Sequence, residues 1–95
     1  MAKTLITAWF STDEQSRGQY LQASEKIFLA HGMTGATLYG SDAAIIGDMQ
    51  PDAVVMVEWE DADRCKQAFK SDEYQKLVNL REKGFNKIDI TLLAE

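Results

Sequence analysis

Four side chains in this sequence could do chemistry, and each falls in or beside an otherwise apolar stretch: His31, Glu58, Tyr74 and Arg81. Glu58 lies in the apolar run 53–60, where a buried carboxylate needs a raised pKa or a cationic partner. Arg81 continues the apolar helical stripe that includes Tyr74, and its planar guanidinium suits a carboxylate or a phosphate. Two unpaired buried charges would be costly, so we expect Glu58 and Arg81 to share one site, paired directly or through a ligand.

Arg81, Tyr74 and His31 also have purely structural interpretations. Arg81 could pack its stem on the stripe while its head reaches water, and the ring of Tyr74 could belong to the core. His31, the single histidine, could act as a general base, but a histidine in the last turn of a helix is also favoured by the helix dipole. One histidine and one cysteine predict no metal site, and no motif indicates a cofactor.

Length and charge restrict the class of protein. Ninety-five residues without a linker or repeat predict a single domain, residues 1–95. The net charge of −5 argues against binding to nucleic acid or to an anionic membrane surface. Cys65 is the only cysteine, so no internal disulfide can form. The N-terminus lacks signal-peptide features and no apolar run approaches a membrane span, so we expect a cytoplasmic protein.

The apolar pattern predicts alternating strands and helices. Strands are expected at 3–10, 35–40 (with 43–47 extending it after a turn), 53–60 and 86–95, and helices at 12–31, 61–69 and 71–84. The last two helices form one helical region in two pieces. This order is the split βαβ, or ferredoxin-like, arrangement: an α+β fold with a four-stranded antiparallel sheet and helices on one face.

Local signals predict how the helices begin and end. Thr12, Asp61 and Ser71 are the expected N-terminal caps. Gly32 and Gly84 are the expected C-terminal stops.

The other face of the predicted sheet has no helix to cover it. A half-solvated antiparallel sheet should alternate apolar and polar residues, but the runs 5–10 and 54–57 are apolar on both sides. The simplest remedy is a homodimer packed sheet to sheet. The alternative is a monomer whose loop 40–52 folds over the face.

The stretch VVMVEWEDADRCKQAFKSDEYQKLVNLR, residues 54–81, resembles a family of small bacterial proteins known as domain of unknown function 1330. The family pattern is an apolar strand ending in Glu and an aromatic residue, a short helix, then Ser-x-Glu-Tyr with an Arg seven residues on. The residues that match it are Glu58, Trp59, Ala68, Ser71, Glu73, Tyr74 and Arg81.

The resemblance implies a dimeric α+β barrel, whose wider relatives hold a small-molecule pocket between sheet and helices. This sequence departs from the pattern at Ile46 and Ala53, where the family often has Glu and Arg, and near Tyr39 and Gly40, where another Arg is usual. If those charges bind a ligand shared by the family, this protein has lost part of that site or binds a less polar molecule.

The leading functional hypothesis is a homodimer that binds a small, partly apolar molecule in a cleft through Arg81, Tyr74, Glu58 and His31. If it turns that molecule over, cofactor-free oxygenation or isomerisation is favoured, because no nucleophile–base pair is visible. The competing hypothesis is a structural or interaction module without a ligand.

Overall fold

Four strands form a single antiparallel sheet in the order β2-β3-β1-β4. The structure, a computed structural model, describes residues 1–95. The strands are β1 (Ala2–Phe10), β2 (Met33–Tyr39), β3 (Ala53–Trp59) and β4 (Phe85–Leu92). The strands β1 and β3, which are far apart in sequence, pair in the centre of the sheet, while β2 and β4 form its edges.

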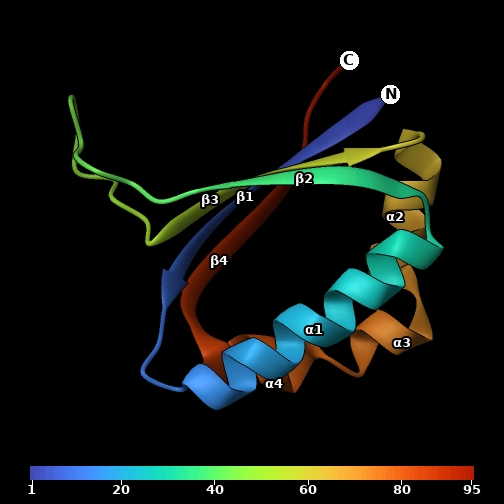
Figure 1. Cartoon of the computed structure of the whole chain (residues 1–95), viewed down its shortest axis with the longest axis horizontal. Helices are drawn as coiled ribbons and strands as arrows, with labels where there is room; N and C mark the ends of the chain where they lie inside the picture. Colours follow the sequence, from blue (N-terminus) through green and yellow to red (C-terminus); the bar gives the residue numbers. More distant parts are fainter.

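All helices lie on one side of this sheet (Figure 1). They are α1 (Glu14–Ala30), α2 (Ala62–Lys70), α3 (Asp72–Gln75) and α4 (Val78–Gly84). The order of elements and the pairing of strands confirm the predicted ferredoxin-like α+β fold. No helix is both long and apolar enough to cross a membrane.

The core lies between the helices and the inward-facing residues of the central strands. Val57 and Trp59 on β3 face the helices, as do Ala2 and Thr4 on the paired strand β1. The indole N–H of Trp59 donates to Thr4 Oγ1 at 3.1 Å, so the largest buried side chain has its polar atom satisfied. Phe28 packs against Trp59 with ring centroids 5.3 Å apart and ties α1 to the sheet.

The first helix begins one residue later than expected. Asp13 is its N-cap and accepts the Ser16 backbone N–H at 3.0 Å, so the prediction of Thr12 as cap is wrong. A carboxylate at Ncap can also interact with the helix dipole, which a threonine cannot. The other end is as predicted: Gly32 follows the helix with φ +92°, a conformation that glycine adopts readily.

Residues 71–84 form two short helices, α3 and α4, rather than one. Ser71 caps α3 as predicted, since its Oγ accepts the Tyr74 backbone N–H at 3.2 Å. Gly84 ends α4, but its φ is not positive, so it is not a left-handed cap. A Cβ at Gly84 would lie 2.7 Å from the Cα of Arg17. Glycine is therefore required by the close approach of α1 and α4.

Residues 40–52 form an irregular loop, and the predicted strand extension at 43–47 is wrong. Ile45 and Ile46 are 90% and 95% exposed, so this short apolar run has no partner strand or core to bury it. The loop projects beyond the end of the sheet (Figure 1) and does not fold over the bare face. The alternative in which this loop covers the face is therefore not observed.

Candidate functional site

Tyr20, Tyr74 and Arg81 form a hydrogen-bonded chain between α1, α3 and α4. The hydroxyl oxygens of Tyr20 and Tyr74 lie 2.7 Å apart. Arg81 Nη1 donates to the Tyr74 hydroxyl oxygen at 3.0 Å. The two tyrosines are only 3% and 2% exposed, while the arginine is half-buried. The charged residue on the apolar stripe therefore lies against a buried polar group and continues the stripe without entering an apolar core.

Burial and hydrogen bonding fix the protonation states of two groups in this chain. Burial raises the pKa of Tyr20 well above its ordinary value, and the neighbouring Tyr74 hydroxyl raises it further. Desolvation opposes the charge of Arg81, but the hydrogen bond from its side chain to Tyr74, together with electrostatic interactions with Tyr74, Tyr20 and Glu82, outweighs that effect and leaves the pKa raised. Tyr20 therefore keeps its proton, and Arg81 stays a cation.

The α1 cavity, about 520 Å³, lies between α1 and the sheet. Fourteen of its sixteen lining residues are hydrophobic. The sixteen residues come from α1 (Tyr20, Leu21, Ser24, Glu25, Phe28) and from the strands (Ile6, Ala8, Phe10, Met33, Ala36, Leu38, Ala53, Val55, Val57, Phe85, Ile88). Ala36 and Leu38 on the edge strand β2 stay exposed, so the cavity is open along that edge. Its size falls within the range of small-molecule sites.

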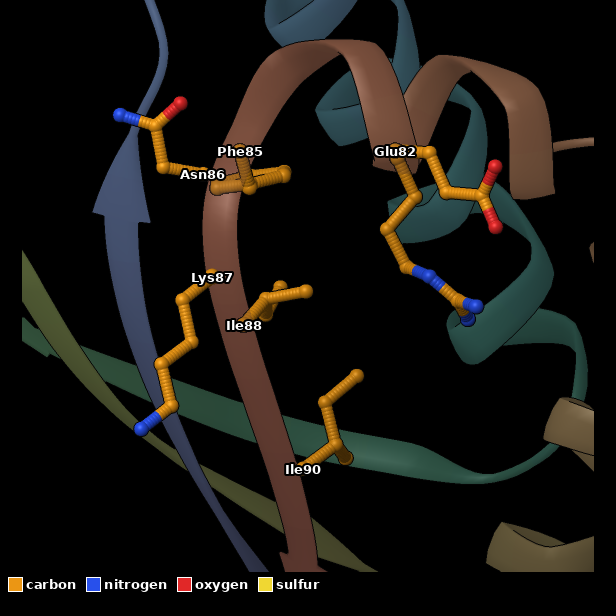
Figure 2. A pocket seen from close by; sticks show the side chains of 7 residues that line it. Glu82, Phe85, Asn86, Lys87, Ile88 and Ile90 are labelled. Carbon is orange, nitrogen blue, oxygen red and sulfur yellow. The ribbon is translucent and has the colours of Figure 1, made fainter.

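Arg81 lines two smaller clefts. The α4 cleft, about 440 Å³, is bounded by Arg81 and Glu82 on α4 and by residues of β4. In Figure 2, Ile88 and Ile90 project from β4 on the side opposite Lys87. The α2–α4 cleft, about 400 Å³, is lined by eleven residues, among them Lys66, Lys70, Tyr74 and Arg81, and by no carboxylate. Tyr20 lines the α1 cavity and Tyr74 lines the α2–α4 cleft, so the bond between their hydroxyls lies at the boundary between the two spaces.

Glu58 does not join this site, and the expected direct pairing of Glu58 with Arg81 is wrong. Glu58 pairs across the sheet with Lys3 and alternates with the buried residues Val57 and Trp59. It therefore projects from the face that carries no helix, whereas Arg81 lies on the helix side. The sheet separates the two charges, and no ion pair forms between them.

His31 is also apart from the site. It is the C-terminal cap of α1, where its backbone N–H donates to Ile27 and Phe28 carbonyl oxygens. It lines neither the α1 cavity nor the two clefts. Of the four residues singled out from the sequence, the structure thus brings together Tyr74 and Arg81 only.

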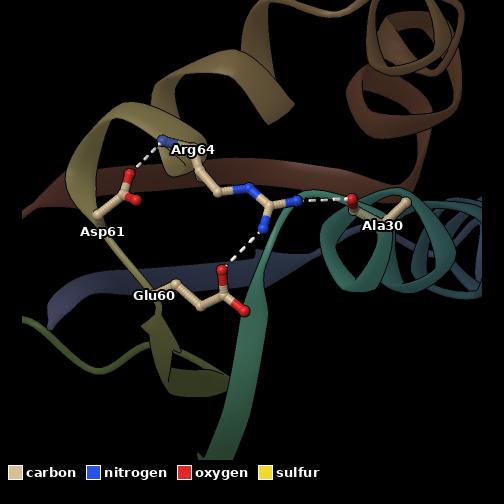
Figure 3. A network of polar contacts seen from close by, with 4 residues as sticks. All are labelled: Ala30, Glu60, Asp61 and Arg64. Carbon is tan, nitrogen blue, oxygen red and sulfur yellow. Dashed lines mark hydrogen bonds and ion pairs between the residues drawn. The ribbon is translucent and has the colours of Figure 1, made fainter.

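A second polar network, centred on Arg64, has a structural role (Figure 3). Arg64 Nη1 lies 2.7 Å from a Glu60 carboxylate oxygen, and Nη2 donates to the Ala30 carbonyl oxygen at 3.0 Å. Asp61 accepts the Arg64 backbone N–H at 2.8 Å and caps α2, as predicted. The network therefore joins the end of α1 to the start of α2, and every functional group in it is already paired.

Tyr20, a buried residue of α1, is not among the residues that the sequence pattern singled out. One signal was present: a tyrosine at a buried position, where phenylalanine would suffice, indicates a hydroxyl that needs a partner. The partner itself, Tyr74, is 54 residues away. No group of three or more His, Cys, Asp or Glu side chains is placed to hold a metal ion.

Several solved structures share this fold. RPA0582, a protein of unknown function from Rhodopseudomonas palustris, is 15% identical with a TM-score of 0.85, covering 99% of this chain and 81% of that one. SnoaB, a cofactor-independent oxygenase from Streptomyces nogalater, is 12% identical with a TM-score of 0.73, covering 99% and 91%. A Nitrosomonas europaea protein assigned to the antibiotic biosynthesis monooxygenases is 10% identical with a TM-score of 0.68, covering 100% and 98%.

These TM-scores show a common fold, and sequence identities this low do not transfer an activity. No curated protein matches the sequence. The model of one family, however, matches residues 5–95. Those residues include the α1 cavity and the chain from Arg81 to Tyr20. The chain therefore belongs to the family described as domain of unknown function (DUF1330).

Proposed function

We propose that this protein binds a small, largely apolar molecule in the α1 cavity. The observation that carries this proposal is the cavity itself: about 520 Å³, with fourteen hydrophobic residues among sixteen. A well-formed apolar cavity with a few polar groups at its wall is the usual form of a small-molecule site. The polar residues in its lining are Tyr20, Ser24 and, at the mouth, the exposed Glu25.

We further propose that the protein is a homodimer that packs through the bare face of the sheet. Leu5, Trp9, Val54 and Met56 lie on that face and are only half-buried in the single chain. A contiguous apolar surface of this kind normally marks an interface. We also propose that the protein is cytoplasmic, as expected from the sequence.

If the bound molecule reacts, cofactor-free oxygenation or isomerisation is the chemistry that we propose. The hydroxyl of Ser24, which lines the α1 cavity, donates to the Leu21 carbonyl oxygen and is not hydrogen-bonded to Glu25, so a nucleophile–base pair is not assembled there. The similarity in fold to a cofactor-independent oxygenase supports this direction at the level of fold alone.

A thermal-shift screen of apolar small molecules tests the binding proposal when it compares two tryptophan variants. Ala36→Trp places a large side chain on the strand position that faces the cavity, while Gln22→Trp adds the same ring to an exposed position of α1 that does not line it. A ligand at a hundred times its Kd contributes about 2.7 kcal/mol, or a shift of roughly 10 °C for a domain of this size.

We expect such ligands to stabilise the wild-type protein and Gln22→Trp but not Ala36→Trp. Ligands that stabilise all three equally would place the binding site elsewhere. If no molecule in the screen stabilises the wild-type protein, the result would favour the competing proposal, a structural or interaction module.

A further inference from the structure

The tyrosine pair has one hydroxyl hydrogen more than the protein can accept. Tyr20 and Tyr74 bring two phenolic hydrogens, and one of them lies in the hydrogen bond between the two oxygens. The third member, Arg81, has only donors, and its Nη1 already donates to the Tyr74 oxygen. Neither hydroxyl has another partner in the protein. One hydrogen of a pair that is almost fully buried is therefore left without a protein acceptor.

The position of Arg81 decides which tyrosine holds that hydrogen. Because the guanidinium donates to the Tyr74 oxygen, the dipoles align when Tyr74 in turn donates to Tyr20. Each donor in such a chain strengthens the next, so this order is favoured over one in which the Tyr74 oxygen accepts two hydrogen bonds. The unpaired hydrogen then belongs to Tyr20, which lines the α1 cavity.

We propose that Tyr20 is the recognition residue of the α1 cavity and donates its free hydroxyl hydrogen to a carbonyl-type oxygen of an otherwise apolar ligand. This inference rests on the proposed binding function and names its ligand class. The walls favour an apolar skeleton, and the carboxylate of Glu25 at the mouth disfavours an anionic group there. An apolar molecule without an acceptor leaves the Tyr20 hydrogen unpaired and binds less tightly.

The same geometry gives Arg81 and Tyr74 a positioning role. The arginine acts on the ligand only through the two hydroxyls, by polarising Tyr74 and then Tyr20. A polarised donor makes a stronger hydrogen bond to a carbonyl oxygen than an isolated hydroxyl does. A ketone is thus the ligand class that this chain of donors fits best.

Two bicyclic probes of one skeleton test the proposal: 1-tetralone, which has one carbonyl group, and tetralin, which has none. Their dissociation constants are measured for the wild-type protein, Tyr20→Phe and the control Tyr39→Phe, a tyrosine that is 58% exposed and lines neither the α1 cavity nor the two clefts. We expect Tyr20→Phe to weaken tetralone binding about tenfold and to leave tetralin binding unchanged or tighter. Tyr39→Phe should change neither.

A second measurement uses the wild-type protein alone, so its result does not depend on whether the variants fold correctly. The carbonyl stretching frequency of bound tetralone should lie below its value in a hydrocarbon solvent, because the carbonyl accepts a hydrogen bond. A frequency equal to the hydrocarbon value overturns the proposal. A larger loss of tetralone binding in Tyr74→Phe than in Tyr20→Phe also overturns it, because the free hydrogen would then belong to Tyr74.

The outcomes separate this inference from the binding function on which it rests. In one outcome, both probes bind, Ala36→Trp abolishes the binding of both, and Tyr20→Phe changes both dissociation constants by the same factor. The cavity then binds apolar molecules, but Tyr20 does not recognise an oxygen. The hydrogen is then taken by water alone, and the inference is wrong. If neither probe binds the wild-type protein, the inference is wrong, and the thermal-shift screen judges the cavity separately.

Discussion

The pairing of Thr4 with Trp59 shows how a single hydroxyl supports the core. The indole of Trp59 is completely buried, and Thr4, 1% exposed, is the only acceptor of its N–H. Thr4→Val keeps the shape of the side chain but removes the acceptor, so we expect a loss of about 1–3 kcal/mol in the free energy of unfolding. Urea denaturation at fixed protein concentration measures it. Thr91→Val, at an exposed position of β4, should change stability by less than about 0.5 kcal/mol, and equal losses would contradict this account.

Cys65 should react slowly with thiol reagents in the folded protein. Its side chain is 2% exposed, on the inner side of α2, and burial raises the pKa of the thiol. Less thiolate is therefore present at a given pH, and reagent reaches it poorly. We expect labelling at pH 8 to be at least about tenfold slower in the native protein than in denaturant. Rapid, stoichiometric labelling under native conditions would show that the thiol is accessible.

At the scale of elements, the contact between α1 and α4 depends on Gly84. The backbone of Arg17 leaves no room for a Cβ there, and Arg17 also donates from Nη1 to the Gly84 carbonyl oxygen at 3.1 Å. Substitution Gly84→Ala must push the two helices apart, because the obstructing atoms are mainly backbone. We expect it to lower the free energy of unfolding by about 1–3 kcal/mol, measured by thermal or urea denaturation.

Gly18 in α1, the helix that contains Arg17, provides the matched control. Nothing lies within 4 Å of a Cβ at Gly18, which occupies an exposed helical position. Gly18→Ala should therefore stabilise the protein by about 0.5–1 kcal/mol, since alanine restricts the unfolded chain and favours the helix. Effects of the same sign at the two glycines would show that helix propensity, rather than the contact between α1 and α4, decides the outcome.

At the scale of the whole molecule, the bare sheet face predicts self-association. Light scattering should give about twice the chain mass of 10.7 kDa. Met56→Lys places a charge at the centre of the face, opposite Leu5, where a dimer would bury it without a partner. We expect that variant to be a folded monomer, whereas Gln22→Lys, on the exposed surface of α1, should remain dimeric. A wild-type monomer, or a Met56→Lys variant with the wild-type mass, would contradict the dimer.

The amino-acid sequence determined most of the fold, because its local signals agree with one another. Ile88, Ile90 and Leu92 alternate along the predicted last strand and lie on its helix side, and Asp61 and Ser71 cap their helices as predicted. The sequence could not show that Ile45 and Ile46 lie in an exposed loop, because an apolar run gives a strand signal whether or not a partner strand is present.

The site was predicted only in part, for a related reason. Helical spacing placed Tyr74 and Arg81 on one face, and their contact follows from residues seven apart in the chain. Period-two alternation places Glu58 on the face of β3 opposite to that of Val57 and Trp59, but it does not indicate which face of the sheet the helices cover. Only the tertiary structure decided that, and only it brought Tyr20 within 2.7 Å of Tyr74. Local spacing specifies which residues share a face, whereas contacts between distant elements depend on how those faces pack.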